Sequence, residues 1–155
     1  MGEKLKKRLK QEKFTNTAQE AILNLFLSNN FLRKKTDDVC AKHGITNAQY
    51  NVLRILKGVH PEGHPRCEII TRMIDQAPDV TRIVDNLEKQ NLIERFNSPD
   101  DRRLSVTKIT KKGLDLLVKM DEEMNGTEKY VTDALSKKEI EQLSEICEKI
   151  YGPHI

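Results

Sequence analysis

Residues 80–87 place apolar side chains along a single helical face, and this stripe constrains the fold more than any other feature. Val80, Ile83, Val84 and Leu87 stand at i, i+3, i+4 and i+7, the spacing of a helix that packs on a core along one side. The other side of "PDVTRIVDNLEKQN" holds the polar residues Arg82, Asp85, Asn86 and Lys89, and Asp79 and Thr81 lie on the flanks near the N-terminus. The segment is therefore predicted to be a helix with one buried face and one outward polar face.

Two short strands joined by a polar turn are predicted directly after this helix. "LIERF" and "LSVTKI" read as strands, and "NSPDD" between them has the composition of a turn. The turn runs on into Arg102 and Arg103, which a hairpin does not need for folding. Two interpretations stay open for "DDRR": a solvated turn whose charges pair locally, or arginines directed at another molecule.

The remaining segments are predicted to be helical. One long helix runs from about Ala18 to Lys42, a second follows a capping box at Thr46 and Gln49, and a short third covers 67–74 after a loop at 58–66. The helix at 80–87 is the fourth, and Thr110 can cap a fifth helix that extends past Gly126 toward Leu135. A last helix, capped by Ser136, is expected to bury Ile140, Leu143, Ile146, Cys147 and Ile150. The predicted fold class is mainly α with a small β-hairpin wing (α+β).

Two short helices, a helix with one apolar stripe, and then a hairpin form the order of a winged helix-turn-helix. A helix fits the width of the DNA major groove, where its N-terminal side chains reach base edges. A hairpin tip reaches the minor groove, whose negative potential favours arginine. The pattern therefore favours double-stranded DNA as the partner.

The stretch "TRIVDNLEKQNLIERFNSPDDRRLSVTKITKKG" resembles the MarR family of bacterial transcriptional regulators. That family has a recognition helix similar to "TRLVDRLE", then "GLIER", a wing containing "DxR", and a strand that closes into "LTxxG". The match covers residues 46 to about 117, and the flanking helices match in pattern and position. Asn91 stands where the family has Gly, and Asn tolerates the same left-handed conformation.

The resemblance implies a single domain over 1–155, with dimerisation helices at 1–45 and 114–155 and a winged helix DNA-binding lobe at 46–113. It also implies a homodimeric repressor on a roughly palindromic operator, released by a small aromatic or phenolic effector. Asp79 stands where the family has Ser or Thr, so it either accepts from cytosine or repels phosphate. The expected DNA-contacting residues are Asp79, Thr81, Arg82, Asn86, Arg102, Arg103 and Lys108, with Asp101 holding a wing arginine extended and Lys111 and Lys112 anchoring phosphates.

Composition sets limits on the class of protein. The net charge is +3, but residues 1–13 alone carry +4, so global charge gives no argument for nucleic acid and individual arginines must carry it. The longest nearly apolar run, 21–27, is shorter than the roughly 20 residues of a membrane span. Three cysteines give no disulfide framework, and the basic start lacks the apolar core of a secretory signal. A cytoplasmic protein without cofactor or membrane association is expected.

A few residues bear on other functions. His60, His64 and Cys67 suggest a metal, but their loop gives no second ligand cluster, so no metal site is predicted. Cys40 lies near Lys42 and is the thiol that a redox-sensing variant would use. A winged-helix module that binds protein remains an alternative, whereas an enzyme is not expected, since there is no Gly-rich phosphate loop and no nucleophile paired with a base. The operator, the regulated genes and the effector cannot be identified from the sequence.

Overall fold

The computed structural model describes residues 2–75, 79–97 and 105–154. Asp101, Arg102 and Arg103 lie outside the described residues. The elements in chain order are α1 (Glu3–Leu9), α2 (Thr17–Lys42), α3 (Asn47–Lys57), β1 (His64–Pro65), α4 (Arg66–Arg72), α5 (Val80–Lys89), β2 (Ile93–Asn97), β3 (Ser105–Ile109), α6 (Lys111–Thr132), α7 (Lys137–Tyr151) and the 3₁₀ turn η1 (Gly152–His154).

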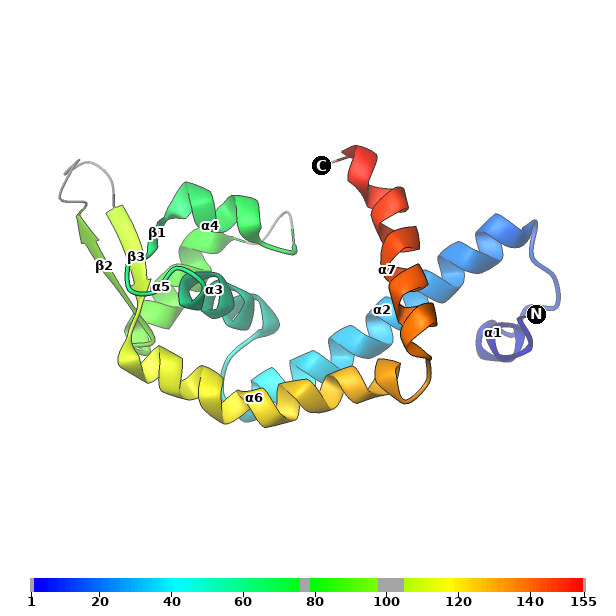
Figure 1. Cartoon of the computed structure of the whole chain (residues 1–155), viewed down its shortest axis with the longest axis horizontal. Helices are drawn as coiled ribbons and strands as arrows, with labels where there is room; N and C mark the ends of the chain where they lie inside the picture. The colour runs from blue at the N-terminus through cyan, green and yellow to red at the C-terminus, as the bar shows by residue number, and fades with distance from the viewer. Residues whose placement is uncertain (1, 76–78, 98–104, 155) are drawn as a thin grey trace.

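A lobe built from α3, α4, α5 and the three strands occupies one end of the molecule (Figure 1). The long helices α2 and α6 pack against each other and contact α3 of the lobe, and α7 turns back from the far end of α6. This arrangement confirms the predicted fold class, a winged helix-turn-helix flanked by N- and C-terminal helices.

Side-chain caps define where the helices begin. The Thr46 hydroxyl accepts from the Gln49 backbone N–H at 3.2 Å, and the Gln49 side chain accepts in return from the Thr46 N–H at 2.8 Å. Ser136 and Glu139 form the same reciprocal pair at the start of α7. Thr110 caps α6 by accepting from the Gly113 N–H at 3.1 Å. All three caps confirm the sequence prediction, because each satisfies backbone donors that a helix start leaves unpaired.

The sheet is antiparallel with the order β1-β3-β2, and β2 pairs with β3 from Ile93 opposite Ile109 to Asn97 opposite Ser105. The sequence prediction of a loop over 58–66 is wrong at its end, because His64 and Pro65 form a short strand against β3. Gly63 precedes this strand with φ of +85°, and a Cβ at this position would collide with the Thr107 carbonyl. Glycine therefore allows β1 to approach β3.

The buried core lies in the lobe and beneath it. Val52, Leu53 and Leu56 of α3 are fully buried, and the C-terminal part of α2 and the first half of α6 close the core from the side. Other core residues are Val39, Cys40, Ile69, Val84, Leu87, Ile93, Leu117 and Met120. The winged lobe is thus held rigidly on the ends of α2 and α6 that lie nearest to it.

The expected burial of the α7 stripe is wrong for the single chain. Leu143, Ile146 and Ile150 are 39%, 53% and 54% exposed, and no described residue of α7 is classed as buried. Along α2, Ile22 and Phe26 are also exposed. The helical periodicity is as predicted, but the described part of this chain packs little against α7 beyond the end of α6. No described helix is long and apolar enough to cross a membrane.

Candidate functional site

Helix α5 presents the polar face that the sequence predicts. Val80, Val84 and Leu87 are buried against the lobe, whereas Thr81, Arg82 and Asn86 are exposed on the outer side. The chain leaves the helix through Asn91 in the left-handed conformation, with φ of +58°. This confirms that Asn supplies the conformation for which the family pattern has Gly. The three outward residues therefore project from a helix that is packed rigidly against the rest of the lobe.

Asp79 has a structural role in this site. Its carboxylate accepts a hydrogen bond from the Arg82 backbone N–H at 3.1 Å and so forms the N-cap of α5. Asp is among the best N-cap residues, and its charge also suits the positive end of the helix dipole. The acid at this position is thereby explained by the start of the helix, and its predicted contact with a base stays a prediction.

Two acidic residues of α5 fasten it to the wing. Arg95 on β2 pairs with Asp85 at 2.9 Å and with Glu88 one turn further along the helix. The hydrogen bond from Arg95 lowers the pKa of Glu88, because it favours the ionised carboxylate. The pairing also neutralises Arg95, which leaves this guanidinium less suited to an external anion.

The base of the wing is joined to the C-terminal end of α5. Lys112 donates to the Gln90 carbonyl at 2.8 Å, and the Thr110 hydroxyl donates to the Asn91 carbonyl at the same distance. Lys108 on β3 is half-buried, with its ammonium 4.3 Å from the centre of the Phe96 ring. Lys112, predicted to anchor phosphate, is thus engaged within the lobe, because it caps the carbonyl end of α5.

The structure brings one further arginine to the site, which the sequence did not single out. Arg66, the first residue of α4, donates from Nη1 to Thr81 Oγ1 at 3.2 Å. It lines a hollow of about 440 Å³ between α4, α5 and β3, together with Thr81, Arg95 and Ser105. The only hint in the sequence is a basic residue at the start of the helix preceding the recognition helix.

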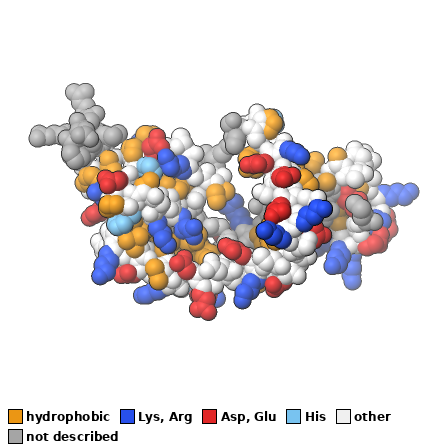
Figure 2. Space-filling view, in the orientation of Figure 1, with side chains coloured by type: hydrophobic (Ala, Val, Ile, Leu, Met, Phe, Trp, Pro, Cys, Tyr) orange, Lys and Arg blue, Asp and Glu red, His pale blue; other side chains and the backbone are white. Residues whose placement is uncertain are grey.

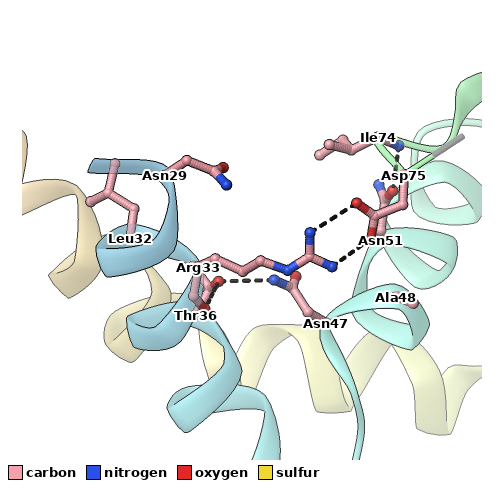
Figure 3. A pocket seen from close by; sticks show the side chains of 9 residues that line it. All are labelled: Asn29, Leu32, Arg33, Thr36, Asn47, Ala48, Asn51, Ile74 and Asp75. Atoms are coloured by element: carbon pink, nitrogen blue, oxygen red, sulfur yellow. Dashed lines mark hydrogen bonds and ion pairs between the residues drawn. The ribbon is translucent and has the colours of Figure 1, made fainter. Parts of the chain in front are cut away.

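A second hollow, of about 210 Å³, lies between α2 and the lobe (Figure 3). Arg33 of α2 crosses it and forms two hydrogen bonds, of 3.0 and 2.7 Å, with the Asp75 carboxylate. Two further bonds accompany this pair, from Asn47 to Thr36 and from the Ile74 N–H to Asn51. The lining residues are Asn29, Leu32, Arg33, Thr36, Asn47, Ala48, Asn51, Ile74 and Asp75.

The thiols and histidines give little support to sensing chemistry. Cys40 is fully buried, and burial together with the nearby Asp37 raises the pKa of its thiol to about 11. A thiol of this kind forms little of the reactive thiolate. Cys67 is exposed at the start of α4. Within residues 2–75, 79–97 and 105–154, no three His, Cys, Asp or Glu side chains are grouped so that they could hold a metal ion.

Charges of both signs are interspersed over the face seen in Figure 2. The overall composition is consistent with this, since the chain has 27 basic and 24 acidic side chains. Attraction to an anionic partner must therefore come from where unpaired cations are placed, and not from the net charge. Among the described arginines of the lobe, Arg72 and Arg95 pair with acids, whereas Arg54, Arg66 and Arg82 form no ion pair with a described residue.

Comparisons with known proteins agree on one family. The model of the MarR family matches residues 45–105. The HTH-type transcriptional regulator MhqR of Bacillus subtilis (strain 168) is 29% identical over 109 residues, which are 70% of this chain and 74% of MhqR.

Two solved structures extend the match to nearly the whole chain. The crystal structure of a MarR transcription factor from Planctomyces limnophilus is 30% identical with a TM-score of 0.68, covering 88% of this chain and 98% of that one. The structure of the S. aureus MepR–DNA complex, 24% identical with a TM-score of 0.76, covers 91% and 99%. The chain described here, with its outward α5 face beside a β-hairpin, belongs to the MarR family of winged helix transcriptional regulators.

Proposed function

We propose that the chain represses transcription by binding a specific, roughly palindromic DNA operator as a homodimer, and that a small molecule releases it. The observation that carries the proposal is the outer face of α5, where Thr81, Arg82 and Asn86 project from a helix fastened to the wing by Arg95. Such a helix fits the major groove, where its N-terminal side chains contact bases. The MepR relative is named as a DNA complex, which is consistent with this role.

A salt titration with selected genomic fragments tests DNA binding. Each phosphate that the protein neutralises adds about 0.9 to the slope of log K against log salt, so operator binding should weaken steeply as salt rises. Arg82→Ala should weaken operator binding by about 1–3 kcal/mol per half-site while affecting a random duplex less. Lys138→Ala on α7 removes one positive charge far from the lobe and serves as the control. A flat salt response of the unchanged protein would contradict the proposal.

The wing arginines enter the same proposal from the sequence alone. Arg102 and Arg103 are proposed to occupy or flank the minor groove, with Asp101 as their positioning partner and Lys108 nearby on β3. Arg103→Ala should cost about 1–3 kcal/mol per half-site if it makes specific groove contacts. Unchanged operator affinity in this variant would remove the wing from the mechanism.

Dimer formation is proposed for the uncovered apolar faces of the outer helices. Leu143, Ile146 and Ile150 on α7, with Ile22 and Phe26 on α2, form apolar surface that a second copy would bury. Sedimentation should therefore give the mass of a dimer, and Ile146→Asp should shift it toward the monomer. Ile74→Asp is the matched control, because Ile74 is 85% exposed and lies outside both helices. A monomer at every concentration of the unchanged protein would exclude this arrangement.

The hollow between α2 and the lobe is the proposed effector site. Its volume of about 210 Å³ lies below the roughly 300–1,000 Å³ of most ligand pockets, which suits a small aromatic or phenolic molecule. Leu32, Ala48 and Ile74 offer apolar contact, and the amides and Arg33 offer hydrogen bonds. An occupant here would touch both α2 and the segment that leads into α5, so it could change how the lobe is held.

A blocking substitution tests the effector site. A panel of small phenols and aromatic acids is screened for release of the operator from the protein. Asn29→Trp should abolish the response to an active compound and keep operator binding, because Asn29 lines the hollow from an exposed position on α2. Asn30→Trp, on the neighbouring exposed residue, should respond like the unchanged protein. An undiminished response in Asn29→Trp would place the effector elsewhere.

A further inference from the structure

We propose that Arg66 is a further DNA-contacting residue, which binds a backbone phosphate and orients the Thr81 hydroxyl as a hydrogen-bond donor to the operator. The proposal rests on the DNA-binding function proposed above. It assigns two roles to one side chain of α4, the helix that precedes the recognition helix α5.

The position of Arg66 is fixed by the sheet. Pro65 pairs with Val106 of β3, and α4 begins at the next residue, so the start of α4 is held against the wing strand. From there Arg66 Nη1 reaches Thr81 Oγ1 at 3.2 Å, across 15 residues of sequence. Thr81 lies in the first turn of α5 and is exposed, the place from which a recognition helix contacts base edges.

The hydrogen bond determines what Thr81 can offer to DNA. A threonine hydroxyl has one hydrogen to donate, and a guanidinium has no acceptor, so Arg66 can only donate to Thr81 Oγ1. One of the two Oγ1 lone pairs is then occupied, which leaves the other lone pair and the hydroxyl hydrogen, and this hydrogen can be donated to an acceptor on a base. In the major groove the matching groups are guanine O6 and N7, adenine N7 and thymine O4. The pair therefore favours an acceptor opposite Thr81, because one of the two lone pairs with which Oγ1 could accept from a base amino group is already used.

The charge on Arg66 points to a phosphate. Arg72 on the same helix pairs with Glu68, and Arg95 across the hollow pairs with Asp85 and Glu88. Arg66 has no acidic partner in the described ranges, and its remaining N–H groups border a hollow of about 440 Å³. An uncompensated guanidinium with several spare donors suits a phosphate oxygen, since it can form charge-assisted bonds with it.

The experiment measures binding of the full-length protein to its selected operator and to a random duplex over a range of salt. Arg66→Ala should lower the salt slope by about 0.9 for each half-site and weaken binding to both duplexes. Arg66→Lys should restore the slope, because it keeps the charge. Arg72→Ala, on the same helix and already neutralised by Glu68, should keep the slope of the unchanged protein. If the alanine variant does not fold, Arg66→Gln removes the charge at smaller cost in side-chain volume.

The orientation of Thr81 is tested by a double-mutant cycle. Thr81→Val should weaken operator binding, leave random-duplex binding and the salt slope unchanged, and cost less in the Arg66→Ala background than alone. An unchanged slope in Arg66→Ala would overturn the phosphate contact, and an equal cost of Thr81→Val in both backgrounds would overturn the orienting role. If the unchanged protein binds no DNA, the proposed function itself fails, which is a separate result.

Discussion

Single residues in this lobe have structural roles and proposed binding roles that composition alone does not separate. Asp79 and Thr81 are both exposed near the start of α5, yet the first caps the helix and the second faces outward beside Arg66. The difference follows from geometry, since an N-cap side chain turns back toward the backbone N–H groups of the first turn.

Asp79→Ala should destabilise the protein by about 0.5–2 kcal/mol, because the Arg82 N–H loses its capping acceptor. Asp79→Ser should recover most of this loss, since a hydroxyl can cap as well. Urea unfolding of the three proteins checks the prediction. Stability equal to that of the unchanged protein in Asp79→Ala would show that the cap contributes little.

The two thiols at 40 and 67 should differ sharply in their reaction with a maleimide. Cys67 is exposed and should be modified rapidly, whereas Cys40 is buried with a thiol pKa of about 11 and should react only after unfolding. Peptide mass spectrometry after timed labelling, with and without denaturant, distinguishes them. Rapid labelling of Cys40 in the folded protein would revive a redox-sensing role.

The outward face of α5 could be predicted because one periodicity separates its buried and exposed residues. Thr81, Arg82 and Asn86 lie on the exposed side, as expected, but whether they contact DNA stays a prediction. Arg66 could not be found in this way. Its contact with Thr81 depends on how α4 and α5 cross, and no local pattern in a single sequence encodes that crossing.

Among the secondary-structure elements, the wing and α5 act as one unit. Arg95 joins β2 to α5. Thr110 and Lys112 join the start of α6 to the C-terminal end of α5. Gly113 belongs to the same junction, since a Cβ at this residue would meet the Leu92 carbonyl. The glycine in "ITKKG" therefore has a packing reason, because α6 starts directly against the chain that enters β2.

The link between Arg95 and Glu88 should depend on pH. The pKa of Glu88 lies below its ordinary value of 4.5 in the folded state, so the pair stabilises the fold above that pH and is lost as the pH falls through the lower folded value. Glu88→Gln should thus be less stable near neutrality by no more than about 1 kcal/mol, since the pair is partly exposed. The difference should vanish in acid. Glu94→Gln, on an exposed carboxylate of β2, is the control, and chemical unfolding at several pH values gives the comparison.

Helix boundaries from Ala18 onward were predicted well from caps and periodicity, whereas β1 and the surroundings of α7 were not. β1 is only His64 and Pro65, too short to show strand alternation, and it forms through pairing with β3. The α7 stripe is periodic as predicted, but periodicity reveals an apolar face without saying which surface covers it. Both misses concern contacts made by distant segments, which local propensity does not determine.

At the scale of the whole molecule, the Arg33–Asp75 pair spans the boundary between the long helices and the lobe (Figure 3). Asp75 stands on the segment between α4 and α5, so the pair holds the approach to the recognition helix against α2. In the proposed dimer, this ion pair would help to set the distance between the two α5 helices.

Breaking the Arg33–Asp75 ion pair should therefore weaken operator binding. Asp75→Ala should reduce affinity at least about fivefold, since the lobe loses one tie to α2 and samples more orientations. The exchanged pair Arg33→Asp with Asp75→Arg should recover part of the loss. Anisotropy titrations on one operator, and on operators with altered half-site spacing, measure the effect. Equal affinity for all spacings in every variant would show that this ion pair does not determine the position of the lobe.

The uncovered stripe on α7 has a consequence for the protein in a cell. A lone chain displays Ile146 and Ile150 to water, so in the proposed assembly each copy would shield the other from proteases and chaperones. Survival of the regulator would then rise with its own abundance. A fall in synthesis would then shorten the lifetime of the protein as well as reduce occupancy of its operator. Occupancy would therefore fall more steeply with the rate of synthesis than the binding equilibrium alone provides.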